Sequence, residues 1–305
     1  LTKQDSDADT DQALEEVFEA AESSYSLLKQ GGIGLNYGFD YSYFGDQRLD
    51  ALIINGNVQN LDIVPSATHT FTNTFSVDYG LLNNVTMGVR VPLIAKFDTA
   101  DDKSNTGLGD LSLSMRWQPV PYVPGKMSTT VFGSFGTATG SSPYEINTNT
   151  QLSTGSGTYS LSSGLSMSKV LDPVVLYGST SLSYTFPLQG LNQVRGASVL
   201  TDVKQGFGLS LSSGFSYSLS YDISLSGSIQ MSYSSETELT FRTAAGSFDS
   251  VSNDQISAIM NFSLGTRVSE KTIINTNVGF GLTEDSPDVL IGLSMQINID
   301  GLKKQ

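Results

Sequence analysis

The sequence offers few residues of the types that carry catalytic or metal-binding chemistry. It has one histidine, His69, and no cysteine among its 305 residues. A serine hydrolase needs a histidine beside its nucleophile, and a zinc site needs several histidine or cysteine ligands. Serine is so frequent in this chain that a serine near His69 carries little meaning. We therefore predict no enzymatic activity, no cofactor and no metal site.

Acidic residues gather in one stretch, FDTADDKSNTGLGD at residues 97–110, but not at the spacing of a calcium-binding loop. We expect a solvated outer loop that meets divalent cations held by lipopolysaccharide. The chain as a whole is acidic, with 30 Asp and Glu against 16 Lys and Arg and a net charge of −14. Nucleic acid is excluded as a partner, because phosphate binding requires a basic surface.

Most of the chain alternates apolar with polar residues, which is the pattern of β-strands. Tight connections such as Asn83-Asn84 and Asp172-Pro173 alternate with long ones at 45–66, 140–156, 188–205 and 235–254. An even number of strands with short turns at one end and long loops at the other predicts an all-β fold, a 12-stranded antiparallel transmembrane β-barrel. The predicted strands are 33–44, 67–82, 85–97, 107–118, 127–139, 157–171, 174–187, 206–221, 223–234, 255–268, 272–282 and 288–300.

The polar face of these strands indicates which side meets water. Along 206–221 it consists of Ser and Gly, without the Lys and Glu that keep a solvent-facing sheet soluble. We infer that the apolar face contacts lipid and that the hydroxyl face lines a lumen, in a bacterial outer membrane containing lipopolysaccharide. No apolar run approaches the ~18 residues of a membrane-spanning helix. The alternatives are a soluble β-sandwich and a Ser-rich solenoid.

A small set of charged residues falls on the inward parity of the predicted strands. Buried charges either pair with one another or line water. Two alternatives follow: a band of opposite charges that sets a constriction, or pairs that brace the wall. The residues are Asp40, Asp78, Arg90, Asp110, Arg116 and Arg267.

The N-terminal part has a different period. Residues 1–11 predict an acidic disordered segment or linker, 12–30 an amphipathic helix, and 31–305 the barrel, with Gly31 and Gly32 as a hinge. We interpret the helix as a plug, against the alternatives of a helix on the membrane surface and of a partner-binding or oligomerising helix. Because the chain starts at Leu1, either a signal peptide has been removed or the chain is truncated. The plug residues are Leu14, Glu15, Glu16, Val17, Phe18, Glu19, Ala21, Glu22, Tyr25 and Leu28.

The run TFSVDYGLLNNVTMGVRVPLIAKF, followed by TGLGDLSLSMRWQP, resembles outer-membrane barrels of the phenol-degradation-channel type. With the helix LEEVFEAAESSYSLLK before the barrel, the chain is similar to the secretion channels of the Fap functional-amyloid system in pseudomonads. That resemblance implies a homotrimer of helix-gated barrels that secretes unfolded amyloid subunits during biofilm formation. A periplasmic protease or accessory proteins would be further partners.

Several functions remain open at this point. The first is a gated pore for unfolded functional-amyloid polypeptide, closed by the N-terminal helix. The alternative is a passive uptake channel for small aromatic or apolar molecules, which predicts an apolar constriction or a lateral wall opening. A structural or adhesive barrel without transport is the third, and a soluble carbohydrate-binding β-protein is the fourth.

Overall fold

A computed structural model describes residues 27–54, 57–99, 101–123, 125–147, 150–196, 198–220, 222–269 and 272–297, and among residues 46–66 it describes the backbone alone. The predicted acidic segment and the predicted helix up to residue 26, including Leu14, Val17, Phe18 and Tyr25, lie outside these residues.

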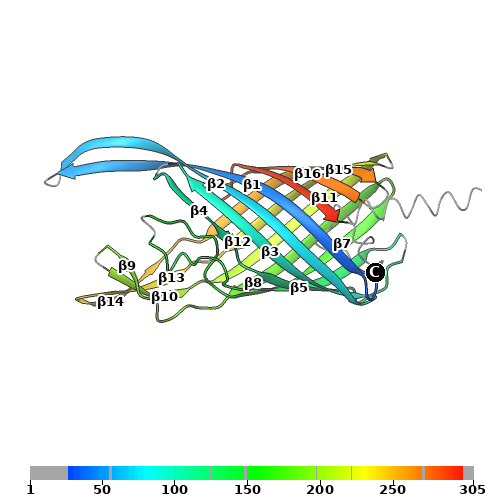
Figure 1. The fold of residues 1–305 in the computed structure, drawn as a ribbon, viewed down its shortest axis with the longest axis horizontal. Helices are drawn as coiled ribbons and strands as arrows, with labels where there is room; N and C mark the ends of the chain where they lie inside the picture. The colour runs from blue at the N-terminus through cyan, green and yellow to red at the C-terminus, as the bar shows by residue number, and fades with distance from the viewer. Residues whose placement is uncertain are drawn as a thin grey trace, which may run out of the picture.

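The described strands form a closed antiparallel barrel, whose axis runs horizontally in Figure 1. Closure is completed by the pairing of β2 with β3. β4 and β5 both pair with β3 and together make one wall strand, so the wall has twelve strands. The wall elements are β1 (Ile33–Ile54), β2 (Asn57–Leu82), β3 (Val85–Asp98), β4 (Lys103–Leu108), β5 (Ser112–Trp117), β6 (Ser128–Gly136), β7 (Ser160–Leu171), β8 (Val174–Thr185), β11 (Phe207–Ser220), β12 (Ile223–Ser234), β15 (Gln255–Ser269), β16 (Thr272–Gly281) and β17 (Val289–Ile297).

Each predicted strand has a counterpart in the wall, which confirms the predicted fold class. Four predicted loops differ. Most of residues 97–110, expected as a solvated outer loop, forms the end of β3 and the strand β4 of the wall. Residues 45–66 continue the β1–β2 ladder as a long hairpin that projects from the barrel (Figure 1). The loops at 188–205 and 235–254 contribute a separate four-stranded sheet of β9 (Gln193–Arg195), β10 (Ser198–Lys204), β13 (Glu238–Thr243) and β14 (Gly246–Val251). Leu200 and Val203 form the small core that stabilises this sheet, since both are almost fully buried.

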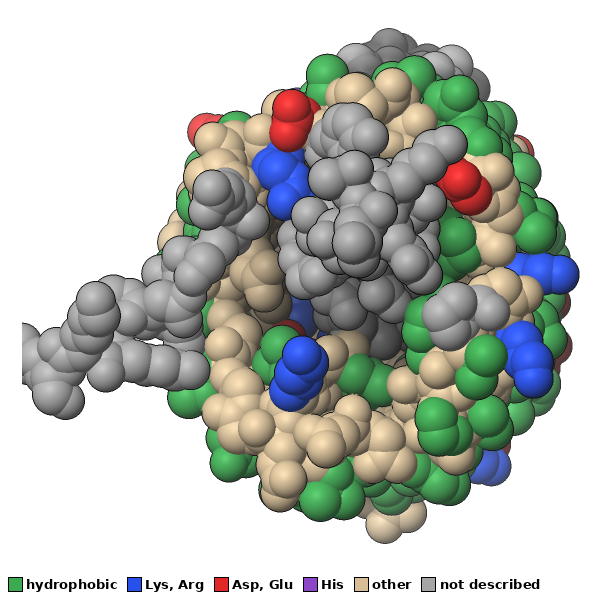
Figure 2. Space-filling model, turned by 90° about the vertical axis from the view of Figure 1, so that its right-hand side faces the viewer, with side chains coloured by type: hydrophobic (Ala, Val, Ile, Leu, Met, Phe, Trp, Pro, Cys, Tyr) green, Lys and Arg blue, Asp and Glu red, His purple; other side chains and the backbone are tan. Residues whose placement is uncertain are grey.

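The apolar side chains lie on the outside of the barrel. In the described part of the chain only five apolar side chains are buried, whereas Val77, Leu211 and Phe262 each remain 46–49% exposed. Figure 2 looks onto the short-turn end and shows hydrophobic side chains around the periphery. A water-soluble β-sandwich would bury these side chains, so the alternative of a soluble protein is wrong and the outer surface is a lipid-facing belt.

The inner face is lined by hydroxyl groups that bond to one another across neighbouring strands. Ser226 donates a hydrogen bond of 3.0 Å to Ser216, and the hydroxyls of Ser179 and Ser212 lie 2.7 Å apart. Ser216 is 1% exposed although its side chain is polar. Small hydroxyl side chains therefore pack closely on the inner wall and bond to one another in these pairs, although the buried hydroxyl of Ser224 has no partner among the described residues.

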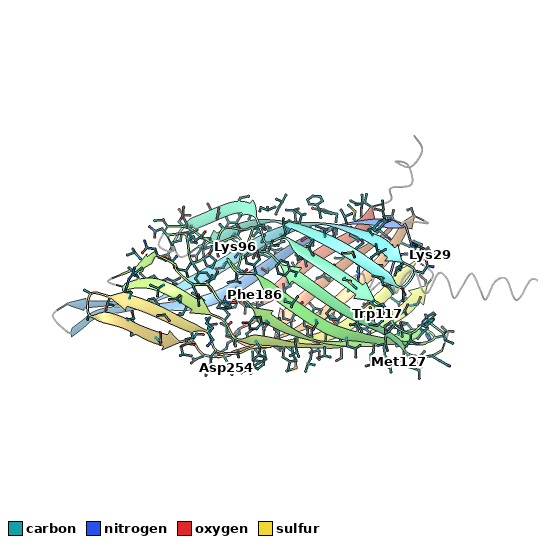
Figure 3. The ribbon with its side chains drawn as sticks, turned by 90° about the horizontal axis from the view of Figure 1, so that it is seen from below. Lys29, Lys96, Trp117, Met127, Phe186 and Asp254 are labelled. Atoms are coloured by element: carbon teal, nitrogen blue, oxygen red, sulfur yellow. The ribbon has the colours of Figure 1, made fainter. Side chains whose placement is uncertain are left out.

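The two ends of the barrel differ. Figure 3 shows Lys29, Trp117 and Met127 towards the short-turn end, and Lys96, Phe186 and Asp254 towards the long-loop end. In outer-membrane barrels the short turns are periplasmic and the long loops extracellular. We use "inner mouth" for the short-turn end and "outer mouth" for the long-loop end. No helix of the described residues combines the length and the apolar character needed to cross a bilayer.

Candidate functional site

An ion pair crosses three strands of the inner wall. Arg116 on β5 donates a hydrogen bond to Asp78 on β2, and Asn36 on β1 donates a second one of 3.2 Å to the same carboxylate. Gly88 on β3 lies between the partners, and a Cβ atom there would come within 2.4 Å of an Asp78 oxygen. The missing side chain of Gly88 thus lets the pair form over β3. For these two residues the arrangement favours the bracing alternative.

Asp40 and Arg90 lie elsewhere on the inner face. Arg90 is exposed and donates a long hydrogen bond of 3.4 Å to Thr74. The carboxylate of Asp40 lies over Gly292 on β17, where a Cβ atom would approach it to 2.6 Å. The half-buried Arg267 pairs in register with Ile273 on β16. The structure therefore brings Asp78 and Arg116 into direct contact and places Arg90 within electrostatic range of Asp40 across β2, whereas Asp110 and Arg267 lie elsewhere on the wall.

The first described residues contact the inward side of β2 and β3 at the inner mouth. The amide of Leu28 donates to the Thr86 hydroxyl at 2.9 Å, and the amide of Gly31 donates to the Gly80 carbonyl at 2.8 Å. A Cβ atom on Gly80 would lie 2.1 Å from the Lys29 carbonyl oxygen, so the chain passes directly over this glycine. The chain thus approaches β1 from inside the wall, through Gly31 with its positive φ of 75°.

The predicted helix extended to residue 30, and its last four residues are not helical. Residues 27–29 are irregular and residues 30–31 form a turn. The amides of residues 28, 30 and 31 bond to the wall, as when Gln30 donates to the Asn83 side chain at 3.1 Å. Bonds to the wall therefore replace the last turn of the predicted helix, including its residue Leu28.

The wall strand made of β4 and β5 contains a bulge. Leu93 pairs with Leu108 and Arg90 pairs with Ser112, so three residues, 109–111, oppose the two residues 91 and 92 of β3. Beyond the bulge, β4 pairs with β3 alone among the described strands. Its second edge is thus without a strand partner within the described residues. The prediction of one continuous strand at 107–118 missed this interruption.

Residues 137–147 and 150–159, which we call the inner segment, cover the free edge of β4 from the lumen side. Asn105, on the less exposed parity of β4, donates to the Leu152 carbonyl at 2.6 Å. Thr154 donates to the Leu108 carbonyl at 2.8 Å and is 4% exposed. The tip of the inner segment is held as well, because Gln193 of β9 donates to the carbonyl of Ile146 at 2.7 Å.

Asp110, in the bulge, makes the central contacts of the inner segment. One carboxylate oxygen accepts the amide of Gly140 at 2.9 Å, and the other accepts the amide and the hydroxyl of Ser156 at 2.6 and 2.7 Å. Asp110 was predicted as a charge that lines the pore, and it holds the inner segment against the wall. A single sequence contains no signal for this contact, since the residues are 30 and 46 positions apart.

Apolar side chains line the inner face next to the bulge. A Cβ atom on Gly109 would come within 2.7 Å of the Ile94 side chain and 3.0 Å of Pro92. Both residues share the inward parity of Arg90 on β3. Phe132 and Tyr177 are also inward, each over a glycine of a neighbouring strand. The prediction of a purely polar lumen was therefore wrong at these positions.

The only histidine lies on the outer surface. The hydroxyl of Tyr41 and Nδ1 of His69 lie 2.9 Å apart, and the two rings stack at 6.1 Å. Nearby, Tyr37 donates a hydrogen bond of 2.7 Å to Asn73, another polar residue on the lipid-facing parity. These pairs shield polar groups from the lipid, since an unpaired polar group in an apolar medium is costly.

No protein-family model matches the chain. Among solved structures, the COG4313 outer membrane channel from Pseudomonas putida F1 has a TM-score of 0.65 and 13% identity, over 89% of this chain and 97% of that one. The fold is that of a bacterial outer-membrane β-barrel. The translocator domain of the autotransporter NalP from Neisseria meningitidis has a TM-score of 0.51 and 10% identity, over 97% of this chain and 98% of that one.

A deletion mutant of the monoaromatic hydrocarbon channel TodX also has a TM-score of 0.51 and 10% identity, covering 89% of this chain and 91% of that one. Together with the lipid-facing belt, these neighbours confirm the predicted fold and the predicted outer-membrane location. The predicted likeness to outer-membrane channels is confirmed at the level of the fold. The amyloid-secretion assignment, the homotrimer and the polypeptide partners remain predictions.

Proposed function

We propose that this barrel is a passive outer-membrane channel for small apolar or aromatic molecules. The observation that carries the proposal is the free edge of β4, which is backed by the inner segment instead of by a strand. A ladder of strand hydrogen bonds cannot open locally without losing many bonds at once. An edge closed by a polar segment can open there while the rest of the barrel stays closed.

An opening in the wall suits an apolar solute. Lipopolysaccharide head groups form the polar barrier outside, and the bilayer core is the favourable medium behind it. A solute that leaves through the wall avoids transfer back into water, which costs about 0.8 kcal/mol per exposed CH₂ group. Pro92 and Ile94 provide apolar contact on the inner face beside this edge. The known hydrocarbon channel TodX has the same kind of fold, so the fold is compatible with this cargo.

Uptake into intact cells tests this proposal. The barrel is produced in a host whose outer leaflet is lipopolysaccharide, and the fluorescent apolar probe N-phenyl-1-naphthylamine is added. Nitrocefin, a charged solute hydrolysed by a periplasmic β-lactamase, serves as the polar comparison. We expect faster entry of the apolar probe than in the host alone, with nitrocefin entry unchanged. Entry of the apolar probe at the rate of the host alone contradicts the proposal.

A second candidate is secretion of unfolded polypeptide through a pore that the N-terminal helix closes. It is supported by the seat of residues 27–32 on the inward side of Gly80 and Thr86 at the inner mouth. Ser and Gly on the inner wall would offer an extended chain weak and reversible hydrogen bonds. In this proposal Glu15, Glu16, Glu19 and Glu22 of the helix would pair with basic groups of the lumen.

A further inference from the structure

We propose that the inner segment is a gate over the free edge of β4 and that the Asp110 carboxylate is its latch. This inference rests on the proposed uptake function, because it names the part of the wall that opens. The proposal concerns a movement of the inner segment alone and leaves the wall strands paired.

The inner segment is held mainly by hydrogen bonds, and its one ring contact among the described residues is that of Tyr159 with Phe135 at its end. Among its described residues the buried side chains are those of Ser142, Thr154 and Thr158, and all three are polar. Segments with few buried apolar contacts open at lower free energy than the core of a fold. The inner segment therefore has the composition expected of a moving part.

Asp110 contributes to closure through hydrogen bonds to a charged group. Its two oxygens accept three hydrogen bonds, from residues near both ends of the inner segment, Gly140 and Ser156. Hydrogen bonds to a charged group are stronger than those between neutral groups. The two ends also pack closely together, since a Cβ atom on Gly140 would lie 2.6 Å from the Cα of Gly155. Release of one carboxylate thus loosens both ends together.

The position of the bulge explains why the latch is there. Gly109 still donates to the Pro92 carbonyl of β3 at 2.8 Å, but the backbone of Leu111 bonds to the start of the inner segment, where the Thr139 hydroxyl accepts the Leu111 amide at 2.8 Å. The bulge turns Asp110 out of the regular strand, as bulges commonly do with side chains at functional positions. Asp110 in this way joins the wall strand to both ends of the gate.

Thiol labelling tests the latch, because the chain has no cysteine of its own. Thr154→Cys places a thiol at a position that is 4% exposed while the gate is closed. We expect a water-soluble maleimide to react about tenfold faster or more when Asp110→Ala is added, as loss of hydrogen bonds to a charged group implies. Asp254→Ala, which removes an exposed carboxylate before β15, is the matched control and leaves the rate unchanged. Equal rates in the Asp110 and Asp254 variants overturn the latch.

A disulfide that locks the gate tests its role in transport. A Cβ atom on Gly107 lies 3.6 Å from the side chain of Thr154, which is within reach of a disulfide between Gly107→Cys and Thr154→Cys. We expect the oxidised double variant to admit N-phenyl-1-naphthylamine at the rate of the host alone, and reduction to restore entry. Unchanged entry in the oxidised form overturns the gate. If the unmodified barrel admits no probe, the uptake proposal fails, and the labelling rates still decide whether Asp110 holds the segment.

The Asp110→Ala variant must also be folded for its labelling to be read. Retention of the heat-modifiable mobility of the barrel on electrophoresis establishes this. Asp110→Asn is the second variant, since it keeps the size of the side chain and replaces an acceptor of the Ser156 bonds by an amide nitrogen. We expect its labelling rate to lie between those of the parent and of Asp110→Ala, and a rate equal to that of the parent overturns the latch.

Discussion

The Asp78–Arg116 pair gives the sharpest test of how the inner wall is braced. The side chains are 6% exposed at Arg116 and 13% exposed at Asp78. Removing one partner of a buried pair costs about 3–5 kcal/mol, whereas an exposed pair contributes about 0–1 kcal/mol. Asp78→Asn keeps the shape of the side chain, so we expect it to lower the free energy of unfolding by about 3 kcal/mol, the lower end of the buried range.

The double variant separates the two explanations of this loss. Arg116→Met removes the unpaired charge and fills a similar volume, so Asp78→Asn with Arg116→Met should return to within about 1 kcal/mol of the parent. Urea unfolding of the barrel from lipid vesicles, followed by Trp117 fluorescence, measures each free energy. The exposed pair of Lys204 and Glu238, at 72% and 44% exposure, is the control and should contribute under about 1 kcal/mol. A small loss in Asp78→Asn that simply adds to the loss in Arg116→Met would refute the buried brace.

Two further predictions concern the ends of the inner face and the lipid-facing surface. Deletion of residues 1–30 should raise conductance in planar bilayers, and unchanged conductance in this deletion would remove the plug assignment. Gly80→Ala should also raise conductance, because its Cβ would lie 2.1 Å from the Lys29 carbonyl oxygen. Gly133→Ala, whose Cβ has no contact shorter than 3.4 Å, is the control. Tyr37→Phe leaves the Asn73 side chain on the lipid face without its tyrosine donor, so we expect the free energy of unfolding from vesicles to fall by about 1–3 kcal/mol. Adding Asn73→Leu should restore this free energy. An unchanged free energy of unfolding in Tyr37→Phe would show that lipid or water replaces the bond.

The strands were predictable from the sequence because a period of two residues acts locally. Segment 223–234 was predicted with the bounds that β12 has, and the hydroxyl-lined inner face follows from the serines on one parity. The helix end was not predictable, because its amides bond to Thr86, Asn83 and Gly80, which lie more than 48 positions away. Periodicity describes neighbours along the chain and contains no information on such contacts.

The candidate site shows the same division. The inward parity of Asp78, Arg116 and Asp110 was readable, yet the roles of these residues depend on partners from other strands. The glycine at position 88 decides the ion pair, and two glycines, 140 and 155, let the inner segment close. A glycine in an alternating strand carries no visible signal in the sequence. Its effect is to leave room for a side chain from another strand, and the sequence alone does not show which side chain lies beside it.

Thiol accessibility on one strand tests the central claim, that apolar side chains meet lipid while hydroxyls line the lumen. On β11, Leu211 is 49% exposed and lies on the outer face, and Ser210 is its inward neighbour. In vesicles, Leu211→Cys should react with a lipid-soluble maleimide and resist a water-soluble one, and Ser210→Cys should show the reverse preference. The opposite preferences, or equal reaction of both thiols with the water-soluble reagent, would contradict the account.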